Sequence, residues 1–340
     1  MGRPIERDRM TRPISRRRFI RISAAAAGLA VVPVGRSAQA VAGLVTWHGT
    51  MLGAVATMQI HHEDRDEAAR LISAACADAR RLERLFSLYL EDSALVELNR
   101  TGILIDPAVE FVDLMAISQR YAELTNGRFD PTVQPLWDLY AGHFSQANAD
   151  QAGPPQSALR AALARVGYER LTISRDRIVM PYGTAVTLNG IAQGYVTDKI
   201  VDLLRSRGVV HSLVDMGETR AIGPRPDGQP WQVGIADPDV AGRTATILPI
   251  VDRAVSTSGA YGFRFDPEGR FNHLFDPATG GCADRYRSVT TVSGNATAAD
   301  ALSTAFSLMG QPQIKAMLPH VGIERVYLID AAGTAHDLVM

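Results

Sequence analysis

The two halves of this chain differ in the periodicity of their apolar residues, and this limits the fold more than any other feature. Apolar residues recur at helical spacing in four ranges, 66–89, 107–127, 157–167 and 192–207. Short β-like runs dominate residues 209–293. The chain does not alternate regularly between strand and helix, so it does not fit a parallel, doubly wound sheet. The pattern therefore predicts an α+β fold with a mixed, mostly antiparallel sheet and packed helices.

Shorter stretches predict the remaining elements. No internal repeat, low-complexity tract or clean linker divides residues 41–340, so we expect them to form one domain. The further elements expected are strands at 50–62, 170–174, 177–180 and 184–188, a polar loop at 141–157, helices at 297–309 and 311–318, and a strand pair within 324–338.

The N-terminus has the features of a twin-arginine signal peptide. The segment "SRRRF" (15–19) precedes an apolar run of 13 residues, Ile22–Val34, which is shorter than the roughly 20 residues needed to span a bilayer. The small residues of Ala38–Ala40 match a cleavage site. An ordinary N-terminal helix is the alternative. We therefore expect residues 1–40 to be removed and residues 41–340 to be periplasmic, with no transmembrane segment after signal removal.

The signal segment also carries most of the positive charge. Residues 1–40 hold nine Arg against two acidic residues, and the whole chain has a net charge of −1, so the remaining 300 residues carry −8. An acidic body without a basic stripe argues against nucleic-acid binding, which depends on neutralising phosphates. Any anionic ligand must then be held locally, by a metal ion or by backbone N–H groups.

Several common ligand-binding motifs are missing. There is no G-x-x-x-x-G-K-[ST] loop, no G-x-G-x-x-G after a strand, no H-E-x-x-H and no C-x-x-C. The cluster "HHED" (61–64) follows a predicted strand and is interpreted as a solvated turn. Cys76 and Cys282 are the only cysteines. They could pair in an oxidising compartment, although Cys76 lies in an Ala-rich predicted helix that we expect to be buried.

Two segments place polar residues among small ones near predicted element ends. In "TLNGIAQGYVTD" (187–198), Gly190 and Gly194 bracket the start of a helix, whose free N–H groups favour an anion. The glycines could equally serve only the turn. In "STSG" (256–259) hydroxyls could line a turn. His273 precedes an Asp-Pro turn and could be an ordinary structural histidine.

The late segment "ATAADALSTAF" (296–306) reads as a helix that carries two oxygen-bearing side chains. Asp300 and Thr304 stand at positions i and i+4, so they present three oxygens on one face. Mg²⁺ prefers a few protein oxygens together with substrate phosphates, and a backbone carbonyl from the Gly190 turn could complete the set. A capping carboxylate with a back-bonded Thr is the alternative.

Six motifs occur together in one order and resemble those of a known family. The chain is similar to the ApbE-type FAD:protein FMN transferases from about residue 49 to its end. The motifs are "SLYLEDSALVELN" (87–99), "NGRFDPTVQPLWDLY" (126–140), "LNGIAQGYVTD" (188–198), "AVSTSGAYGFRF" (254–265), "HLFDPATGG" (273–281) and "ADALSTAFSLMG" (299–310).

The resemblance implies a T-fold-like α+β fold that binds FAD as substrate with Mg²⁺. It also implies cleavage of the FAD pyrophosphate, attachment of FMN through a phosphoester to a Thr or Ser of a target flavoprotein, and release of AMP. The implied roles are metal binding by the backbone oxygen of Gly190 and by Asp300 and Thr304, catalysis by His273 with Asp276 nearby, and FAD contacts from Leu52, Tyr89, Phe129, Asp130, Thr187, Gln193, His273 and Ser303.

Two departures from the family pattern stand out. Many members have Asp and Lys where this chain has Thr187 and Gln193, and Leu52-Gly53-Ala54 replaces a usual Met-Gly-Thr. Two alternatives to the transferase remain, a periplasmic pyrophosphatase that splits FAD into FMN and AMP, and an FAD-binding carrier without turnover. The acceptors that the resemblance implies are flavin-bearing subunits of membrane electron-transfer complexes.

Overall fold

The computed structural model describes residues 29–30 and 43–340. The expected signal peptide therefore lies outside the described residues, except for Leu29–Ala30, which form strand β1 and pair antiparallel with β9. Removal of residues 1–40 stays a prediction. Among the described residues, no helix has the length and apolar character needed to cross a membrane.

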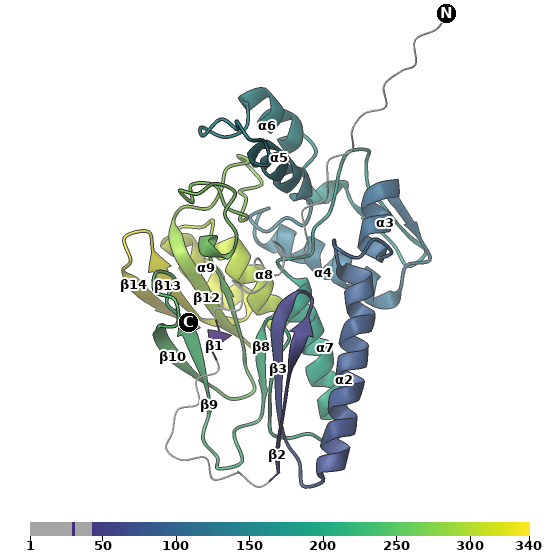
Figure 1. The fold of residues 1–340 in the computed structure, drawn as a ribbon, viewed down its shortest axis with the longest axis vertical. Helices are drawn as coiled ribbons and strands as arrows, with labels where there is room; N and C mark the ends of the chain where they lie inside the picture. The colour runs from purple at the N-terminus through teal and green to yellow at the C-terminus, as the bar shows by residue number, and fades with distance from the viewer. Residues whose placement is uncertain (1–28, 31–42) are drawn as a thin grey trace, which may run out of the picture.

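An eight-stranded sheet forms the centre of the molecule, and all its neighbouring strands are antiparallel (Figure 1). This confirms the predicted fold class. In spatial order the strands are β14 (Ala335–Val339), β13 (Ile323–Asp330), β12 (Tyr286–Ser293), β11 (Ala254–Ser258), β8 (Thr219–Ile222), β7 (Ser212–Asp215), β3 (Ala54–His61) and β2 (Leu44–Met51).

Two three-stranded sheets lie beside the large one. Their strands are β1 (Leu29–Ala30), β9 (Trp231–Ala236) and β10 (Thr244–Ile250) in the first, and β4 (Ile103–Ile105), β6 (Arg177–Val179) and β5 (Thr172–Ile173) in the second.

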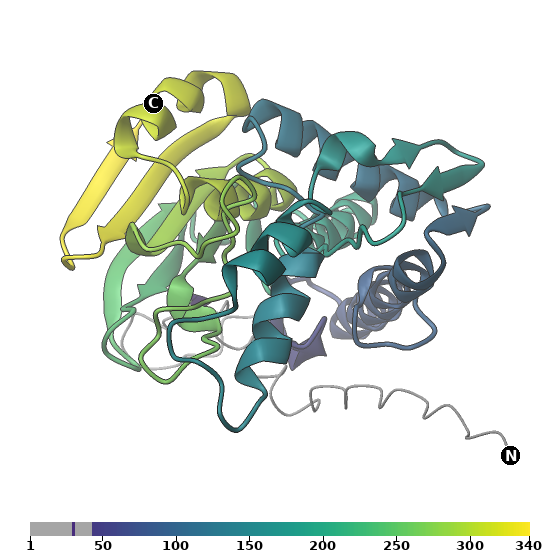
Figure 2. The same ribbon diagram turned by 90° about the horizontal axis from the view of Figure 1, so that it is seen from above.

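Eight α-helices occur in the described part of the chain, with 3₁₀ turns at Tyr168–Arg170 and Ala260–Gly262. Helix α7 packs between α2 and α8, and all three helices contact strands of the large sheet (Figure 1). Seen from above, α5 and α6 lie between the C-terminal strand pair and the helices α2 to α4 (Figure 2). The helices are α2 (Arg65–Phe86), α3 (Ala94–Thr101), α4 (Val109–Leu124), α5 (Gln134–Phe144), α6 (Gln156–Leu163), α7 (Ala192–Ser206), α8 (Ala296–Phe306) and α9 (Gln311–Val321).

The strand expected over residues 50–62 is confirmed only from Ala54 to His61, because a hairpin turn interrupts the expected range. Leu52 and Gly53 form the turn between β2 and β3, with φ values of 50° and 75°. A tight hairpin requires positive φ at both central residues, and Gly adopts it readily. Leu adopts a positive φ rarely, so a turn at this position was not expected.

The strand expected at 184–188 is also absent. Asn99 binds Val186 as a neighbouring strand would, because its side-chain Nδ2 donates to the Val186 carbonyl at 2.8 Å and its Oδ1 accepts from the Val186 N–H at 2.7 Å. The segment therefore satisfies its backbone without a sheet. The helices α3 and α5 were not predicted. The "HHED" segment is a turn, and Asp64 caps α2 by accepting from two backbone N–H groups.

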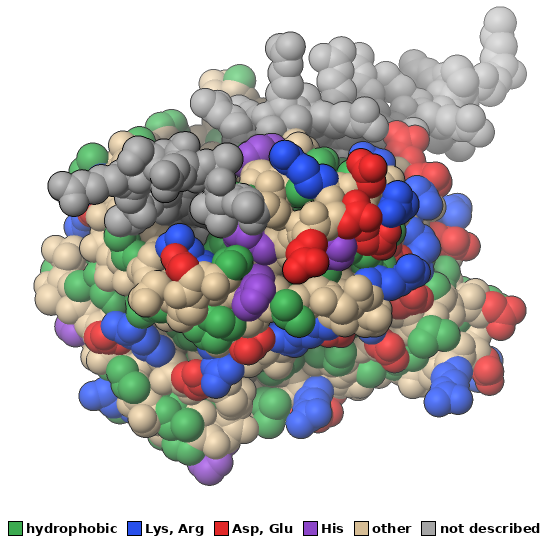
Figure 3. All heavy atoms as spheres, turned by 90° about the horizontal axis from the view of Figure 1, so that it is seen from below, with side chains coloured by type: hydrophobic (Ala, Val, Ile, Leu, Met, Phe, Trp, Pro, Cys, Tyr) green, Lys and Arg blue, Asp and Glu red, His purple; other side chains and the backbone are tan. Residues whose placement is uncertain are grey.

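The main hydrophobic core lies between the large sheet and the helices, with Phe86, Phe111 and Phe306 among its largest buried side chains. Cys76 is buried in α2 and Cys282 is half-buried, and both are free thiols. On the face seen from below, acidic and basic side chains are interspersed rather than sorted by sign (Figure 3). That face shows no basic stripe of the kind a nucleic-acid-binding protein would need.

Candidate functional site

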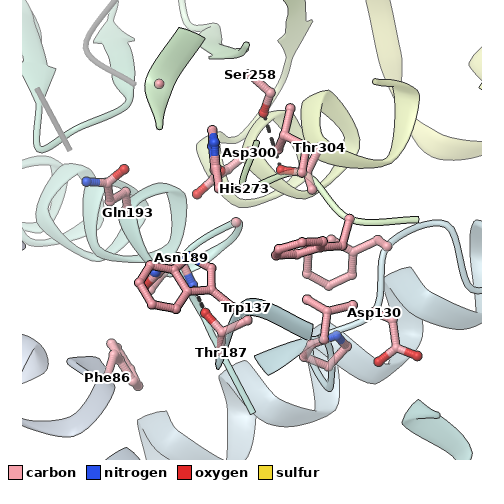
Figure 4. Close-up of a pocket in the computed structure, with 18 of the residues that line it drawn as sticks. Phe86, Asp130, Trp137, Thr187, Asn189, Gln193, Ser258, His273, Asp300 and Thr304 are labelled. Atoms are coloured by element: carbon pink, nitrogen blue, oxygen red, sulfur yellow. Dashed lines mark hydrogen bonds between the residues drawn. The ribbon is translucent and has the colours of Figure 1, made fainter. Parts of the chain in front are cut away.

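One pocket gathers residues from eight separate stretches of the chain and is partly open to solvent (Figure 4). Ten of the twelve residues predicted for the site line it, namely Leu52, Tyr89, Phe129, Asp130, Thr187, Gly190, Gln193, His273, Asp300 and Thr304. Asp276 and Ser303 do not line it.

The close contact of α7 with α8 forms one wall of the pocket. Gly194 in α7 has no room for a side chain, since an added Cβ would overlap the Ala296 carbonyl and lie 2.9 Å from Asp300 Cβ. This approach lets the Gly194 N–H donate to Asp300 Oδ2 at 3.0 Å. Glycine is therefore required at position 194 for the close packing of the two helices. Its N–H donates to a carboxylate of the protein rather than to a bound anion.

Helix α8 is rich in small residues because it is buried on nearly all sides. Every residue from Ala296 to Phe306 is buried except Thr304, which is half-buried and faces the pocket. Asn295 caps α8 by accepting from the Ala298 N–H, so Asp300 does not cap its own helix. It accepts instead from the Gly194 N–H in the first turn of α7, so a capping role toward that helix remains as the alternative to metal binding. Thr304 Oγ1 lies 3.3 Å from Ser258 Oγ.

Gly190 meets Thr304 across the same wall. A Cβ added to Gly190 would lie 3.0 Å from Thr304 Oγ1, so the backbone of the 190 turn is next to the hydroxyl. The Asp300 carboxylate is only 4% exposed. Its Oδ1 has no hydrogen-bond partner among the residues that the structure describes. The three predicted metal ligands thus converge on the pocket.

A hydroxyl cluster from β11 holds this part of α8 in place. Ser303 Oγ lies 2.7 Å from Ser258 Oγ and 3.2 Å from Ser256 Oγ. Figure 4 shows the contact between Ser258 and Thr304, whose Oγ atoms are 3.3 Å apart. Ser303 is fully buried. It contacts the sheet here, and its predicted contact with FAD stays a prediction.

A second carboxylate, Glu218, lies on the same wall and was missed by the sequence analysis. It is 2% exposed, it lines the pocket, and its Oε2 has no hydrogen-bond partner. Burial and the nearby Asp300 raise its pKa well above the ordinary value. Burial likewise raises the pKa of Asp300 to about 7. Only its position in the turn after β7, next to Gly217, brings Glu218 to the pocket.

The donor set fits a hard divalent cation. Asp300 and Thr304 supply side-chain oxygens, Gly190 can supply a carbonyl, and the unpartnered Oε2 of Glu218 adds negative charge. No group of three or more His, Cys, Asp or Glu side chains suited to a metal occurs among residues 29–30 and 43–340. Of the three predicted ligands, only Asp300 supplies a side chain of these four types. The predicted metal site therefore does not require a cluster of three or more of them.

His273 reaches the same end of the pocket from a loop. Its ring Nδ1 lies 3.3 Å from the carbonyl of Phe263, which fixes Nδ1 as the protonated nitrogen and leaves Nε2 able to accept a proton. Burial lowers the pKa of His273 to about 4, so the ring is neutral near pH 7. Figure 4 shows His273 with Asp300 and Thr304 at one side of the pocket.

Asp276 forms its side-chain hydrogen bonds with residues other than His273. Its Oδ1 accepts from Arg128 Nη1 at 2.9 Å and from the Ala278 N–H at 3.0 Å. The side chain thus joins the 273–281 turn to the stretch before Asp130. Its catalytic role stays a prediction.

The remaining predicted contacts surround the middle of the pocket. Asp130 accepts from the N–H and the hydroxyl of Thr132 and from the Tyr168 N–H, so it organises the turn that it occupies. Thr187 Oγ1 accepts from the Asn189 N–H at 3.3 Å. Burial raises the pKa of Tyr89 to about 12, so its phenol stays protonated at neutral pH.

The opposite wall of the pocket is aromatic, a feature that was not expected from the sequence. Trp137 in α5 lines the pocket and stacks on Phe263 with ring centroids 5.7 Å apart. Phe263 in turn packs edge-on against Phe265 at 5.0 Å. These rings belong to a small core formed by α5, α6 and the 263–282 loops. The motif "QPLW" contains the signal that was missed, a Pro at a helix start followed by apolar residues.

Comparison with known proteins identifies the family of this chain. The ApbE family model matches residues 52–327. FAD:protein FMN transferases from Klebsiella pneumoniae and Treponema pallidum are 30% and 31% identical to this chain, over 80% and 72% of its length and 79% and 73% of theirs.

Solved structures are similar over almost the whole fold. The ApbE protein of Thermotoga maritima superimposes with a TM-score of 0.77 at 27% identity, covering 86% of this chain and 96% of its own. The flavinyl transferase ApbE of Pseudomonas stutzeri gives 0.73 at 27% identity, covering 87% and 94%. The match of motifs, chain length and fold shows that this protein belongs to the ApbE family.

Proposed function

We propose that this protein is a Mg²⁺-dependent FAD:protein FMN transferase that works in the periplasm. The observation that carries the proposal is the α7–α8 contact, which brings Gly190, Asp300 and Thr304 together on a pocket wall that His273 also reaches. The names of the relatives support transfer of FMN from FAD to a protein. The twin-arginine segment supports export.

In the proposed reaction a Thr or Ser hydroxyl of the acceptor attacks the phosphorus on the FMN side of the FAD pyrophosphate. A new P–O bond forms to the hydroxyl oxygen, the bond to the bridging oxygen breaks, and AMP leaves with that oxygen. A reaction of this kind depends on alignment and charge stabilisation rather than on covalent help. Mg²⁺ held by Gly190, Asp300 and Thr304 would neutralise charge on the phosphates.

The residues of the chain supply the other requirements. Neutral His273 can accept the proton of the attacking hydroxyl at Nε2, since its Nδ1–H is held by Phe263. General-base help of this kind typically contributes about 10²–10⁴ in rate. The aromatic wall at Trp137 offers a flat surface for a ring of the dinucleotide.

The acceptor is proposed from the family resemblance alone, as a flavin-bearing subunit of a membrane electron-transfer complex. A hydrolase would use water in place of the hydroxyl, and a carrier would not turn FAD over. Residues 41–340 should be incubated with FAD, Mg²⁺ and a candidate acceptor domain, and the products followed by mass spectrometry and nucleotide analysis. We expect the acceptor to gain one FMN and one AMP to appear for each.

The same assay separates the alternatives. FMN and AMP produced at the same rate without an acceptor would indicate the pyrophosphatase, and FAD recovered intact under all conditions would indicate the carrier. Either result would contradict the transferase. The variant His273→Gln should lower transfer about 10²-fold while FAD still binds.

A further inference from the structure

The pocket wall carries more acidic than basic side chains. Asp130, Glu218 and Asp300 are acidic, whereas Arg128 is the only Lys or Arg among the described residues that line the pocket. Gln193, another lining residue, is neutral. A dinucleotide brings negatively charged phosphates into this acidic surrounding. Arg128 is therefore the one fixed positive side chain that the described pocket can offer to them.

Arg128 is held in position from the other side of the pocket. Its Nη1 donates to Asp276 Oδ1 at 2.9 Å, and the side chains of Arg128 and Asp276 are 35% and 20% exposed. Phe129 follows Arg128, and Phe275 and Pro277 flank Asp276, and all three line the pocket. The ion pair thus joins two stretches of the wall that are 148 residues apart in sequence.

The pair leaves most of the guanidinium available. Arg128 uses one donor for Asp276, and its Nη2 and Nε have no hydrogen-bond partner among the residues that the structure describes. A guanidinium carries five N–H donors in a planar fork, which suits two oxygens of one phosphate. Fixing the fork through Asp276 lowers the entropy lost when an anion binds.

From this geometry we infer, given the proposed function, that Arg128 binds a phosphate of the flavin substrate and that Asp276 positions it. The acceptor's carboxylates are a less suitable partner, because they approach from solvent, where an exposed ion pair contributes little. A phosphate bound inside the acidic pocket is stabilised more by the Arg128 guanidinium than an exposed carboxylate is. Asp276 acts here as a positioning residue, through Arg128 rather than through His273.

Binding measurements on the unmodified pocket and on variants test this inference without turnover. FAD, FMN and riboflavin, which lacks phosphate, should be titrated by flavin fluorescence, once in EDTA and once in Mg²⁺. Arg128→Gln should weaken FAD and FMN by about tenfold or more in EDTA, as expected for a lost charged hydrogen bond, and leave riboflavin unchanged. Arg128→Lys should recover part of the loss. The matched control is Arg175→Gln, which removes one exposed Arg from the turn between β5 and β6.

The positioning role of Asp276 is tested by a double-mutant cycle. Asp276→Asn alone should weaken FMN binding severalfold, and it should have no further effect in the Arg128→Gln background, since coupled residues are not additive. Additive effects would overturn the positioning role. Equal losses of FAD and riboflavin in Arg128→Gln, or no loss of either, would overturn phosphate binding by Arg128. If the unmodified protein bound no flavin at all, the proposed function itself would fail.

Discussion

The two walls of the pocket are built by opposite means. The wall made by α7, α8 and the end of β11 holds buried oxygens in place with short hydrogen bonds between small residues. The wall made by α5 and the 263–275 loop consists of stacked rings, and its best-placed member, Trp137, is held by packing. Figure 4 shows Trp137 between the group around His273 and the more distant Phe86.

The difference separates chemistry from recognition. Oxygens that hold a cation or orient a phosphate must stand at fixed positions, and the buried hydrogen bonds around them fix those positions. A flat aromatic surface gains affinity for a ring through area and tolerates small shifts. Changes in the polar wall should therefore abolish reaction or stability, whereas changes in the aromatic wall should only weaken binding.

The largest effect is expected at Asp300. Asp300→Ala should lower Mg²⁺-dependent FAD cleavage and FMN transfer by about 10³-fold or more, because the charge that would hold the cation is lost. Asp300→Asn keeps an oxygen for the Gly194 N–H and should fold with an unchanged Tm, but it should be equally inactive. Product analysis at several Mg²⁺ concentrations measures this. Unchanged AMP release by either variant would count against the metal assignment.

The next effect is a loss of stability at Asp198. This residue of α7 accepts from the backbone N–H groups of Ala296 and Thr297, at 2.8 Å each, and pairs with Arg220 at 2.6 Å. Asp198→Ala should cost about 3–5 kcal/mol in unfolding free energy, because it leaves a buried cation unpaired and uncaps α8.

Urea denaturation measures that cost, and another Arg–Asp pair provides the control. Asp337→Ala breaks an exposed pair with Arg325 and should cost no more than about 1 kcal/mol. Equal costs for the two variants would show that the α7–α8 wall has no special dependence on buried charge.

A smaller effect, on the pH dependence of stability, is expected at Asp215. Burial raises the pKa of this carboxyl from 3.8 to about 6, so the folded protein holds a proton that the unfolded chain releases. The stability from this group is complete below about pH 4 and is lost as pH rises toward 7, by about 3 kcal/mol at most. Asp215→Asn should flatten the stability of the metal-free protein over this range. An unchanged slope in chemical denaturation would contradict this.

The smallest effect is expected in the aromatic wall. Trp137→Leu should weaken FAD and riboflavin alike by about tenfold, because a stacking surface is lost and no charge is involved. Phe144→Leu is the matched control, since Phe144 packs in the same aromatic core without lining the pocket. Flavin titration should show no change for it. If Trp137→Leu weakened the binding of FAD but not that of riboflavin, the proposed difference between the two walls would be wrong.

The sequence revealed much of the polar wall and little of the aromatic one. Asp300 and Thr304 stood out because oxygen-bearing side chains in an alanine-rich helix have few structural uses. Glu218 and Arg128 did not stand out, since acidic and basic residues in turns are usually solvated. Trp137 was hidden in a helix that was not predicted, and the hairpin at Leu52 depends on a positive φ that Leu rarely adopts.

Local periodicity and six ordered motifs determined the fold class, the family and most of the residues around the pocket, because they depend on neighbours in the chain. The tertiary structure alone decided which of those residues meet. Four such contacts join residues 82 to 148 positions apart in the chain: Gly194 with Ala296, Asp198 with the start of α8, Glu218 with Asp300, and Arg128 with Asp276. Such contacts are set by the packing of whole elements, and nothing in the local sequence encodes them.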